Sequence, residues 1–215
     1  MKNSGPEGKA PLSSPLLILI SAPSGGGKTT LCQHILARHP DMARAITCTT
    51  RPPRPGEIDG RDYYFLDDDA YAQRLANGGF LENATVYEHC YGIPKDEVLD
   101  KLGQGVDVLL NVDVQGAATV LARAADDPAL ARALVTVFLT PASLAVLDTR
   151  LRRRGADSAE ELARRLGVAR QEIAQWRNFQ YLIVSTTVAE DVRRMEAIID
   201  AERLRQSRSN FTLDG

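Results

Sequence analysis

The stretch LLILISAPSGGGKTT, residues 16–30, decides the fold. Its first five residues form an unbroken apolar run, which is typical of a strand buried on both faces of a parallel sheet. After a glycine-rich turn, residues 29–38 carry apolar side chains at helical spacing, at Leu31, Ile35 and Leu36. A buried strand, a glycine turn and a helix in this order predict a phosphate-binding loop at the carboxyl edge of a sheet.

The turn itself matches the P-loop pattern G-x-x-x-x-G-K-[ST] except at its first position, where Ala22 replaces glycine. Three consecutive glycines lack a Cβ, so their N–H groups can surround a phosphate, and the helix N-terminus adds positive potential there. Lys28 supplies a mobile charge for the outer phosphates, and the Thr29 hydroxyl is a candidate magnesium ligand. We therefore expect an ATP or GTP phosphate at this loop.

The rest of the chain alternates buried strands, expected at residues 106–112, 134–139 and 181–185, with helices. This alternation predicts a parallel sheet with helices on both faces. Between residues 45 and 94 the pattern changes. RDYYFL and FLENATVYEH have the alternation of half-exposed strands, and residues 67–77 read as a helix. We expect an inserted subdomain of mixed α+β character there, a disordered tail at residues 1–14 and a loose end from residue 205.

Composition excludes several classes of protein. The formal net charge is −2 and the pI about 6.0, which argues against a nucleic-acid-binding protein. No run of eighteen apolar residues and no signal peptide is found, so we expect no membrane partner and a cytoplasmic location. The three cysteines and three histidines lack metal-site or disulfide spacing: Cys32, Cys48 and Cys90, and His34, His39 and His89.

The segment TCTTRPPRPGEIDGRD, residues 47–62, narrows the choice among P-loop proteins. Arg51 and Arg54 stand three residues apart in a loop stiffened by three prolines, which suits two guanidiniums for a second phosphate. A GTPase would carry an N-K-x-D motif to read guanine, and the chain has none. The pattern favours a kinase whose acceptor is itself phosphorylated.

At this point the chain resembles the guanylate kinases, which transfer a phosphoryl group from ATP to GMP. The resemblance spans about residues 15–204 and rests on SAPSGGGKTT, TTRPPRPGEIDGRDYYF, FLEN, YGIPK, NVDVQGA and RLRRRG. YGIPK followed by VDVQGAAT is similar to the plastid-type members, beside the bacterial ones. The family implies a P-loop NTPase-type sheet formed by residues 15–45 and 95–204, a GMP-binding insertion at about 46–94, and an arginine-rich lid at about 150–166.

The resemblance also implies roles for individual residues. The GMP phosphate would be held by two arginines and two phenols: Arg51, Arg54, Tyr63 and Tyr91. Glu82 would accept hydrogen bonds from guanine N1–H and N2–H₂, which adenine does not offer as a pair, and Thr47 would also touch the base. Three of these side chains have an ordinary alternative: Glu82 as an exposed strand residue, and both tyrosines as core aromatics. The arginine pair is harder to explain in this way.

On the ATP side, the implied cofactors are ATP and Mg²⁺, with Thr29 and Asp113 at the metal and Asp113 close to the substrates. The lid arginines Arg150, Arg154 and Arg165 would join Lys28 in stabilising the transferred phosphoryl group, although residues 150–154 also read as a solvated helix end. The loop residues implied to bind ATP are Ala22, Pro23, Ser24, Gly25, Gly26, Gly27, Lys28, Thr29 and Thr30.

Two positions depart from the family pattern, since Ile93 and Asn111 stand where a hydroxyl and a carboxylate are usual. Two rivals stay open: a ribose bisphosphate kinase, which need not carry Thr47 and Glu82, and a guanylate-kinase-like scaffold domain that binds phosphopeptides without chemistry. Such scaffold domains usually have a broken P-loop, whereas Lys28 and Thr29 are present here. The expected partners are GMP and ATP, with the chain a monomer or homodimer.

Overall fold

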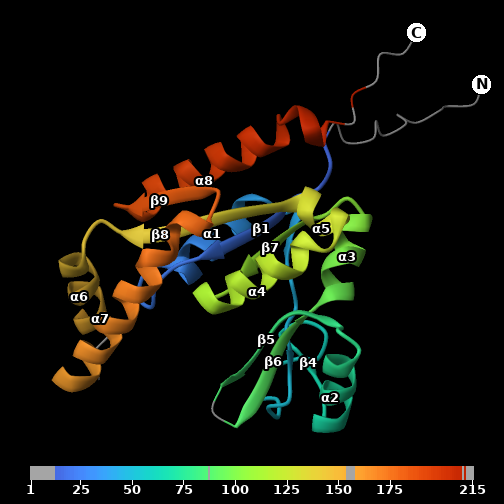
Figure 1. Ribbon diagram of the computed structural model, residues 1–215, viewed down its shortest axis with the longest axis horizontal. Coiled ribbons are helices and arrows are strands. Elements are labelled where there is room, and N and C mark those ends of the chain that lie inside the picture. Colours follow the sequence, from blue (N-terminus) through green and yellow to red (C-terminus); the bar gives the residue numbers. More distant parts are fainter. Residues whose placement is uncertain (1–12, 87, 154–157, 210, 212–215) are drawn as a thin grey trace, which may run out of the picture.

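The computed structural model describes residues 13–86, 88–153, 158–209 and 211. Its core is a five-stranded sheet in which every neighbouring pair of strands is parallel (Figure 1). The glycine loop follows the central strand of this sheet. It therefore lies at the carboxyl edge of the sheet, between the ends of the two neighbouring strands. The strand order is β2 (Met42–Arg44), β7 (Asp107–Asn111), β1 (Leu17–Ser21), β8 (Leu134–Pro141) and β9 (Tyr181–Ser185).

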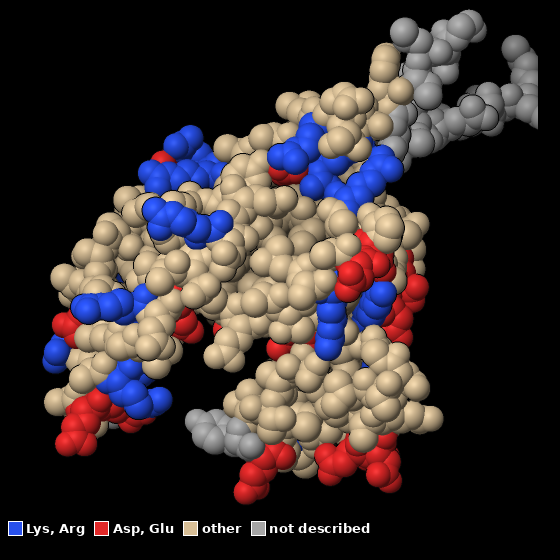
Figure 2. Space-filling view, viewed as in Figure 1, with Lys and Arg blue, Asp and Glu red and all other residues tan. Residues whose placement is uncertain are grey.

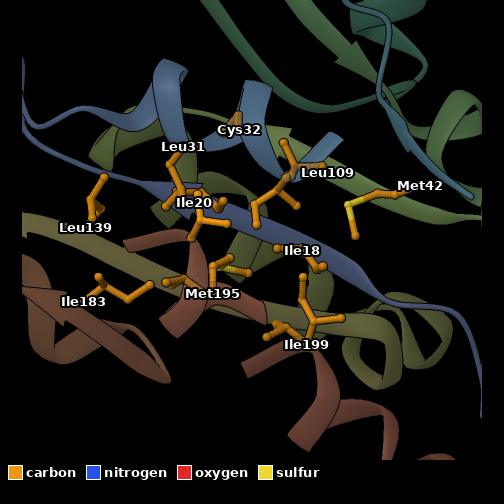
Figure 3. Packing of buried hydrophobic residues seen from close by; sticks show 14 of the residues in the cluster. Ile18, Ile20, Leu31, Cys32, Met42, Leu109, Leu139, Ile183, Met195 and Ile199 are labelled. Carbon is orange, nitrogen blue, oxygen red and sulfur yellow. The ribbon is translucent and has the colours of Figure 1, made fainter. Parts of the chain in front are cut away.

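Helices cover both faces of this sheet, as the strand–helix alternation predicts. On one face lie α1 (Lys28–Arg38) and α8 (Val188–Arg203), and on the other α3 (Lys95–Gly103), α4 (Val114–Ala125) and α5 (Pro128–Ala133). Successive β1 residues point to opposite faces, so Ile18 and Ile20 pack with α1 and α8, as Figure 3 shows, while Leu17 and Leu19 pack with the other three helices. Every β1 residue is buried.

The inserted subdomain lies below the core in Figure 1 and forms a second sheet. Its order is β4 (Tyr64–Phe65), β3 (Cys48–Thr49), β6 (His89–Pro94) and β5 (Phe80–Val86), with α2 (Asp68–Ala76) alongside. The predicted strand segment FLENATVYEH contains the whole of β5 and ends at His89, the first residue of β6, which pairs with β5 as a hairpin. A small apolar cluster of Cys48, Tyr71 and Phe80 supports this subdomain.

The lid predicted at about residues 150–166 falls within a helical projection made of α6 (Leu144–Arg153) and α7 (Ala159–Ala174), followed by the 3₁₀ turn η1 (Gln175–Asn178). This projection is called the lid below. The two helices pack through their own cluster, which includes Leu147, Leu151 and Leu162. Figure 2 shows an open notch between the lid and the inserted subdomain. The core sheet joins these two projections, so a change in their separation would open or close the notch.

The expected tails need a correction. Ser13 pairs with Ser209, and the Ser14 N–H donates to the Arg208 carbonyl at 2.9 Å. The expected loose end contains η2 (Gln206–Arg208), and Arg208 is buried because it pairs with the buried Glu202 carboxylate at 3.0 Å. Residues 1–12, 210 and 212–215 of the expected tails lie outside the described residues. Among the described helices, none is both long and apolar enough to span a membrane.

Candidate active site

The glycine loop turns tightly between β1 and α1. The Gly26 N–H donates to the Pro23 carbonyl at 2.8 Å, and Gly25 and Gly27 adopt φ angles of +82° and +98°, which disfavour any residue with a Cβ. A Cβ at position 25 would lie 2.8 Å from Leu151 Cδ2 of the lid helix α6. Two features therefore favour glycine at position 25, namely the positive φ angle of the backbone and the close approach of α6.

Helix α1 begins at the loop with Gly27 as its N-cap and no side-chain cap, which leaves its first-turn N–H groups directed at the loop. Lys28 Nζ donates to the Val112 carbonyl at 2.5 Å, so the side chain spans the loop toward the end of β7. Burial lowers the pKa of Lys28, and the nearby Asp113 carboxylate opposes that shift. Thr29 and Thr30 are exposed at the same helix end.

Asp113 follows β7 and caps α4, because its Oδ1 accepts the Gly116 N–H at 2.7 Å. Glu82 of β5 reaches the same place from the inserted subdomain. Burial and, to a lesser extent, the neighbouring Asp113 raise the pKa of the half-buried Glu82 carboxyl to about 7, and Arg123 and Lys28 oppose the shift. The structure thus brings together Lys28, Asp113 and Glu82, which come from three distant segments of the chain.

The proline-rich loop that carries Arg51 and Arg54, called the arginine loop below, is held by a residue for which the sequence predicts no role. Glu57 accepts Arg51 Nη2 through both carboxylate oxygens, at 2.9 and 3.0 Å, and its Oε2 also accepts the Arg54 N–H at 2.7 Å. The hydrogen bond from Arg51 is the largest cause of a lowered Glu57 pKa. Both arginine positions of the loop are therefore tied to one carboxylate.

The remaining residues of the predicted GMP site lie around this loop. The Arg51 guanidinium lies 5.5 Å from the centre of the Tyr63 ring, and the Tyr63 and Tyr91 rings meet edge-on with centres 6.2 Å apart. Arg54 is exposed to solvent. Thr47 precedes β3, where its carbonyl accepts the Tyr64 N–H at 3.0 Å.

Two of the three predicted lid arginines contact the glycine loop. Arg150 Nη1 donates to the Gly26 carbonyl at 3.3 Å, and Arg165 Nη2 donates to Ser24 Oγ at 3.0 Å. The third, Arg154, lies outside the described residues. For Arg150, the alternative of a solvated helix end is therefore not supported, because its guanidinium contacts the glycine loop.

Further residues of this region have no role predicted from the sequence. Glu172 of α7 accepts the Ser24 N–H at 3.2 Å, so a carboxylate and a guanidinium of α7 both contact Ser24. On the opposite side of Arg150, Nη2 donates to Ser185 Oγ at 3.1 Å, and Ser185 donates to the buried Asp191 at 2.6 Å. These partners are far apart in sequence, so no motif links them before the fold is known.

The residues fit ATP and a magnesium ion. The uncapped start of α1 offers N–H donors to phosphate oxygens, and a cavity of about 420 Å³ lies beside the loop, lined in part by Gly27, Arg150 and Thr186. Magnesium bound by kinases takes one or two protein oxygens besides phosphate oxygens and water. The Thr29 hydroxyl and the Asp113 carboxylate provide such a donor set, since capping uses only one Asp113 oxygen.

A parallel core sheet, a phosphate loop with a lysine, an arginine-bearing lid and an inserted subdomain together define a P-loop kinase. The chain belongs to the guanylate kinase family, whose model matches residues 14–202. It is 40% identical to the guanylate kinase of Maricaulis maris over 193 residues, which cover 90% of this chain and 86% of that one.

Two further comparisons agree. The guanylate kinase of Sphingopyxis alaskensis is 42% identical over 193 residues, covering 90% of this chain and 85% of that protein. The crystal structure of guanylate kinase from Anaplasma phagocytophilum superposes with a TM-score of 0.68 at 28% identity, covering 92% of this chain and 91% of that one. The resemblance drawn from the motifs is therefore confirmed at the level of family and fold.

Proposed function

We propose that this protein transfers the γ-phosphoryl group of ATP to GMP, giving ADP and GDP. The observation that carries the proposal is that Glu82 and Asp113 both lie against Gly116, while Lys28 from the phosphate loop reaches the carbonyl of Val112, the residue before Asp113. Guanine presents adjacent N1–H and N2–H₂ donors to a carboxylate, whereas adenine would leave the buried charge without this pair of partners. A base-reading carboxylate and a phosphate-binding lysine in one site match a nucleoside monophosphate acceptor.

The phosphate of GMP would bind at the arginine loop. Arg51 and Arg54 supply charge-assisted donors, and the Tyr63 and Tyr91 hydroxyls supply neutral ones. Glu57 holds Arg51 through a two-oxygen contact before any ligand arrives. Less side-chain freedom is then lost when the phosphate binds, which favours affinity.

The triphosphate of ATP would bind residues 22–30 in an arrangement that the loop already has. N–H groups at the start of α1 would hold phosphate oxygens, and Lys28 would exchange its contact with the Val112 carbonyl for the outer phosphates. Thr29 and Asp113 would hold Mg²⁺, which neutralises charge on the phosphates when bound. The nucleoside part would lie in the cavity beside Arg150.

The chemistry requires positioning and charge neutralisation more than proton transfer, because the acceptor is already an anionic phosphate oxygen. Arg150 and Arg165 contact the loop from the lid, and the family resemblance adds Arg154. The notch in Figure 2 would close as the lid and the inserted subdomain approach each other. Closure would bring the two nucleotides together and exclude water that would otherwise hydrolyse ATP.

A coupled assay of ADP release with ATP and Mg²⁺ tests the proposal, with GMP, dGMP, AMP, UMP and CMP offered in parallel. We expect turnover with GMP and dGMP alone. Lys28→Met should abolish turnover, whereas the control Lys95→Met, which removes only a lysine paired with Asp127, should not. Folded protein that binds GMP but turns over none of the nucleotides would contradict the proposal and favour a binding module without chemistry.

A further inference from the structure

The strand that carries Glu82 is irregular at that residue. Phe80 pairs with Pro94, but Glu82 pairs with Ile93, so β5 contains one residue more than β6 across this step, a β-bulge. A bulge leaves a residue outside the regular hydrogen-bond ladder and redirects the side chain that follows it. The direction of the Glu82 carboxylate therefore depends on how this bulge is held.

The bulge lies where two apolar clusters meet. Phe80 belongs to the cluster of the inserted subdomain and stacks on Tyr71 with ring centres 4.8 Å apart. Its neighbour Leu81 belongs to the core cluster, together with Val120 and Ala124 of α4. The start of β5 is thus fastened to the inserted subdomain by one side chain and to the core by the next.

Arg123 of α4 holds the backbone of this bulge. Its Nη1 donates to the Phe80 carbonyl, and its Nη2 donates to Asn83 Oδ1 at 3.2 Å. The two acceptors stand on either side of Glu82 in the sequence. The planar guanidinium presents its donors at fixed spacing, so it holds the Phe80 backbone on one side of the carboxylate and the Asn83 side chain on the other.

The same helix also provides the space that the Glu82 side chain needs. A Cβ at position 116 would lie 3.0 Å from Glu82 Cγ and 3.3 Å from its Cδ, so the carboxylate side chain lies directly against Gly116. Gly116 is buried in the first turn of α4, and Arg123 stands two turns further along the same helix. One core helix therefore both holds the bulged backbone and receives the side chain.

We infer that Arg123 is a positioning residue for guanine recognition, which acts through Glu82 without touching the nucleotide. This inference rests on the proposed function of Glu82 as the group that reads guanine. It assigns part of the base specificity to a core helix, although the base-reading residue belongs to the inserted subdomain. Removing the guanidinium leaves the bulge free to relax, and the carboxylate then no longer meets the guanine donors at the required geometry.

Steady-state kinetics of Arg123→Met test the inference, with Arg123→Lys as the conservative variant and Arg38→Met as the control. Arg38 is an exposed α1 arginine paired with Glu196. In Arg123→Met we expect KM for GMP to rise about tenfold, as for loss of hydrogen bonds from a charged donor. KM for ATP and kcat should change less than twofold, the preference for GMP over AMP should fall, and Arg123→Lys should restore part of the loss.

A double-mutant cycle separates positioning from general structural support. If Arg123 acts through Glu82, Arg123→Met should change KM for GMP less than twofold in a Glu82→Gln background. An equal rise in both backgrounds would overturn the inference, as would an unchanged KM in the single variant. If the wild-type protein does not phosphorylate GMP at all, the proposed function itself fails, which is a different outcome.

Discussion

At the scale of single residues, Gly25 is a position where the loop tolerates substitution poorly. Gly25→Ala should lower the free energy of unfolding by about 2–4 kcal/mol, because strain at φ +82° adds to a contact of 2.8 Å with Leu151. Urea unfolding measures the change. Gly105→Ala is the matched control, since its φ is +79° but a Cβ there meets nothing within 4 Å. Equal losses in both variants would show that the lid contact contributes nothing.

Glu82 predicts a pH dependence of GMP binding. Burial raises its pKa to about 7, and the guanine donors require the ionised carboxylate, so KM for GMP should rise as pH falls. At pH 6 the rise should be roughly tenfold relative to pH 8, one pH unit below that pKa. The GMP phosphate titrates near pH 6 as well, so the profile of Glu82→Gln provides the baseline. Identical profiles for the two proteins would refute the prediction.

Without a ligand, the Glu82 carboxyl stabilises the folded protein at low pH, whereas GMP binding is favoured at high pH. Its pKa is raised from 4.5 to about 7, so the protonated form is favoured by folding. This contribution to stability is complete below pH 4.5 and is lost as the pH rises through about 7. Guanine binding then offsets the loss, because its donors favour the charged form.

The motif residues show how far single residues can be predicted from sequence. The family pattern singled out Lys28, Asp113 and Glu82, and the fold brings these three residues near one another, although the roles implied for them stay predictions. The partners that orient such residues could not be foreseen. Glu57 is within the quoted arginine block, yet its contact with Arg51 depends on a turn of the loop. Arg123 contacts β5 across 40 or more residues of sequence, so no local pattern indicates this contact.

At the scale of elements, buried strands were the most predictable part of the fold. The last core strand has the predicted bounds, and the others differ by one or two residues. The short elements without a prediction include β2, β3, α3 and α5. The sequence does contain a helix-start pattern for α5, because Asp127 is the N-cap and proline occupies the first helical position. Short β2 and α3 depend on packing against the core, which local sequence does not report.

The arginine loop gives a prediction at this scale, because its shape depends on one carboxylate. Glu57→Gln removes the charge that holds Arg51 and should raise KM for GMP about fivefold, since the guanidinium must then be ordered by the ligand. KM for ATP should stay unchanged. Glu196→Gln, which disturbs only an exposed pair with Arg38, is the control. A lowered KM for GMP would show instead that Glu57 competes with the phosphate.

At the scale of the whole molecule, the C-terminal segment contributes to stability, contrary to its loose appearance in the sequence. Arg208→Met should cost about 3 kcal/mol of unfolding free energy, because the buried Glu202 loses its buried partner. Thermal unfolding should shift down by roughly 6–12 °C for a domain of this size. Arg205→Met is the control, since Arg205 also pairs with Glu202 but its side chain is half exposed. Equal shifts would contradict the prediction.

The pairing of Ser13 with Ser209 has a consequence for the order of the chain itself. The two described ends meet where β1 begins, whereas the phosphate loop lies where β1 ends (Figure 1). A short linker between them would close the polypeptide into a ring, which could then be opened at another surface turn. In such a circular permutant the elements would be synthesised in a new order. Each strand would keep its neighbours, provided that β1, the loop and α1 remain one uncut segment.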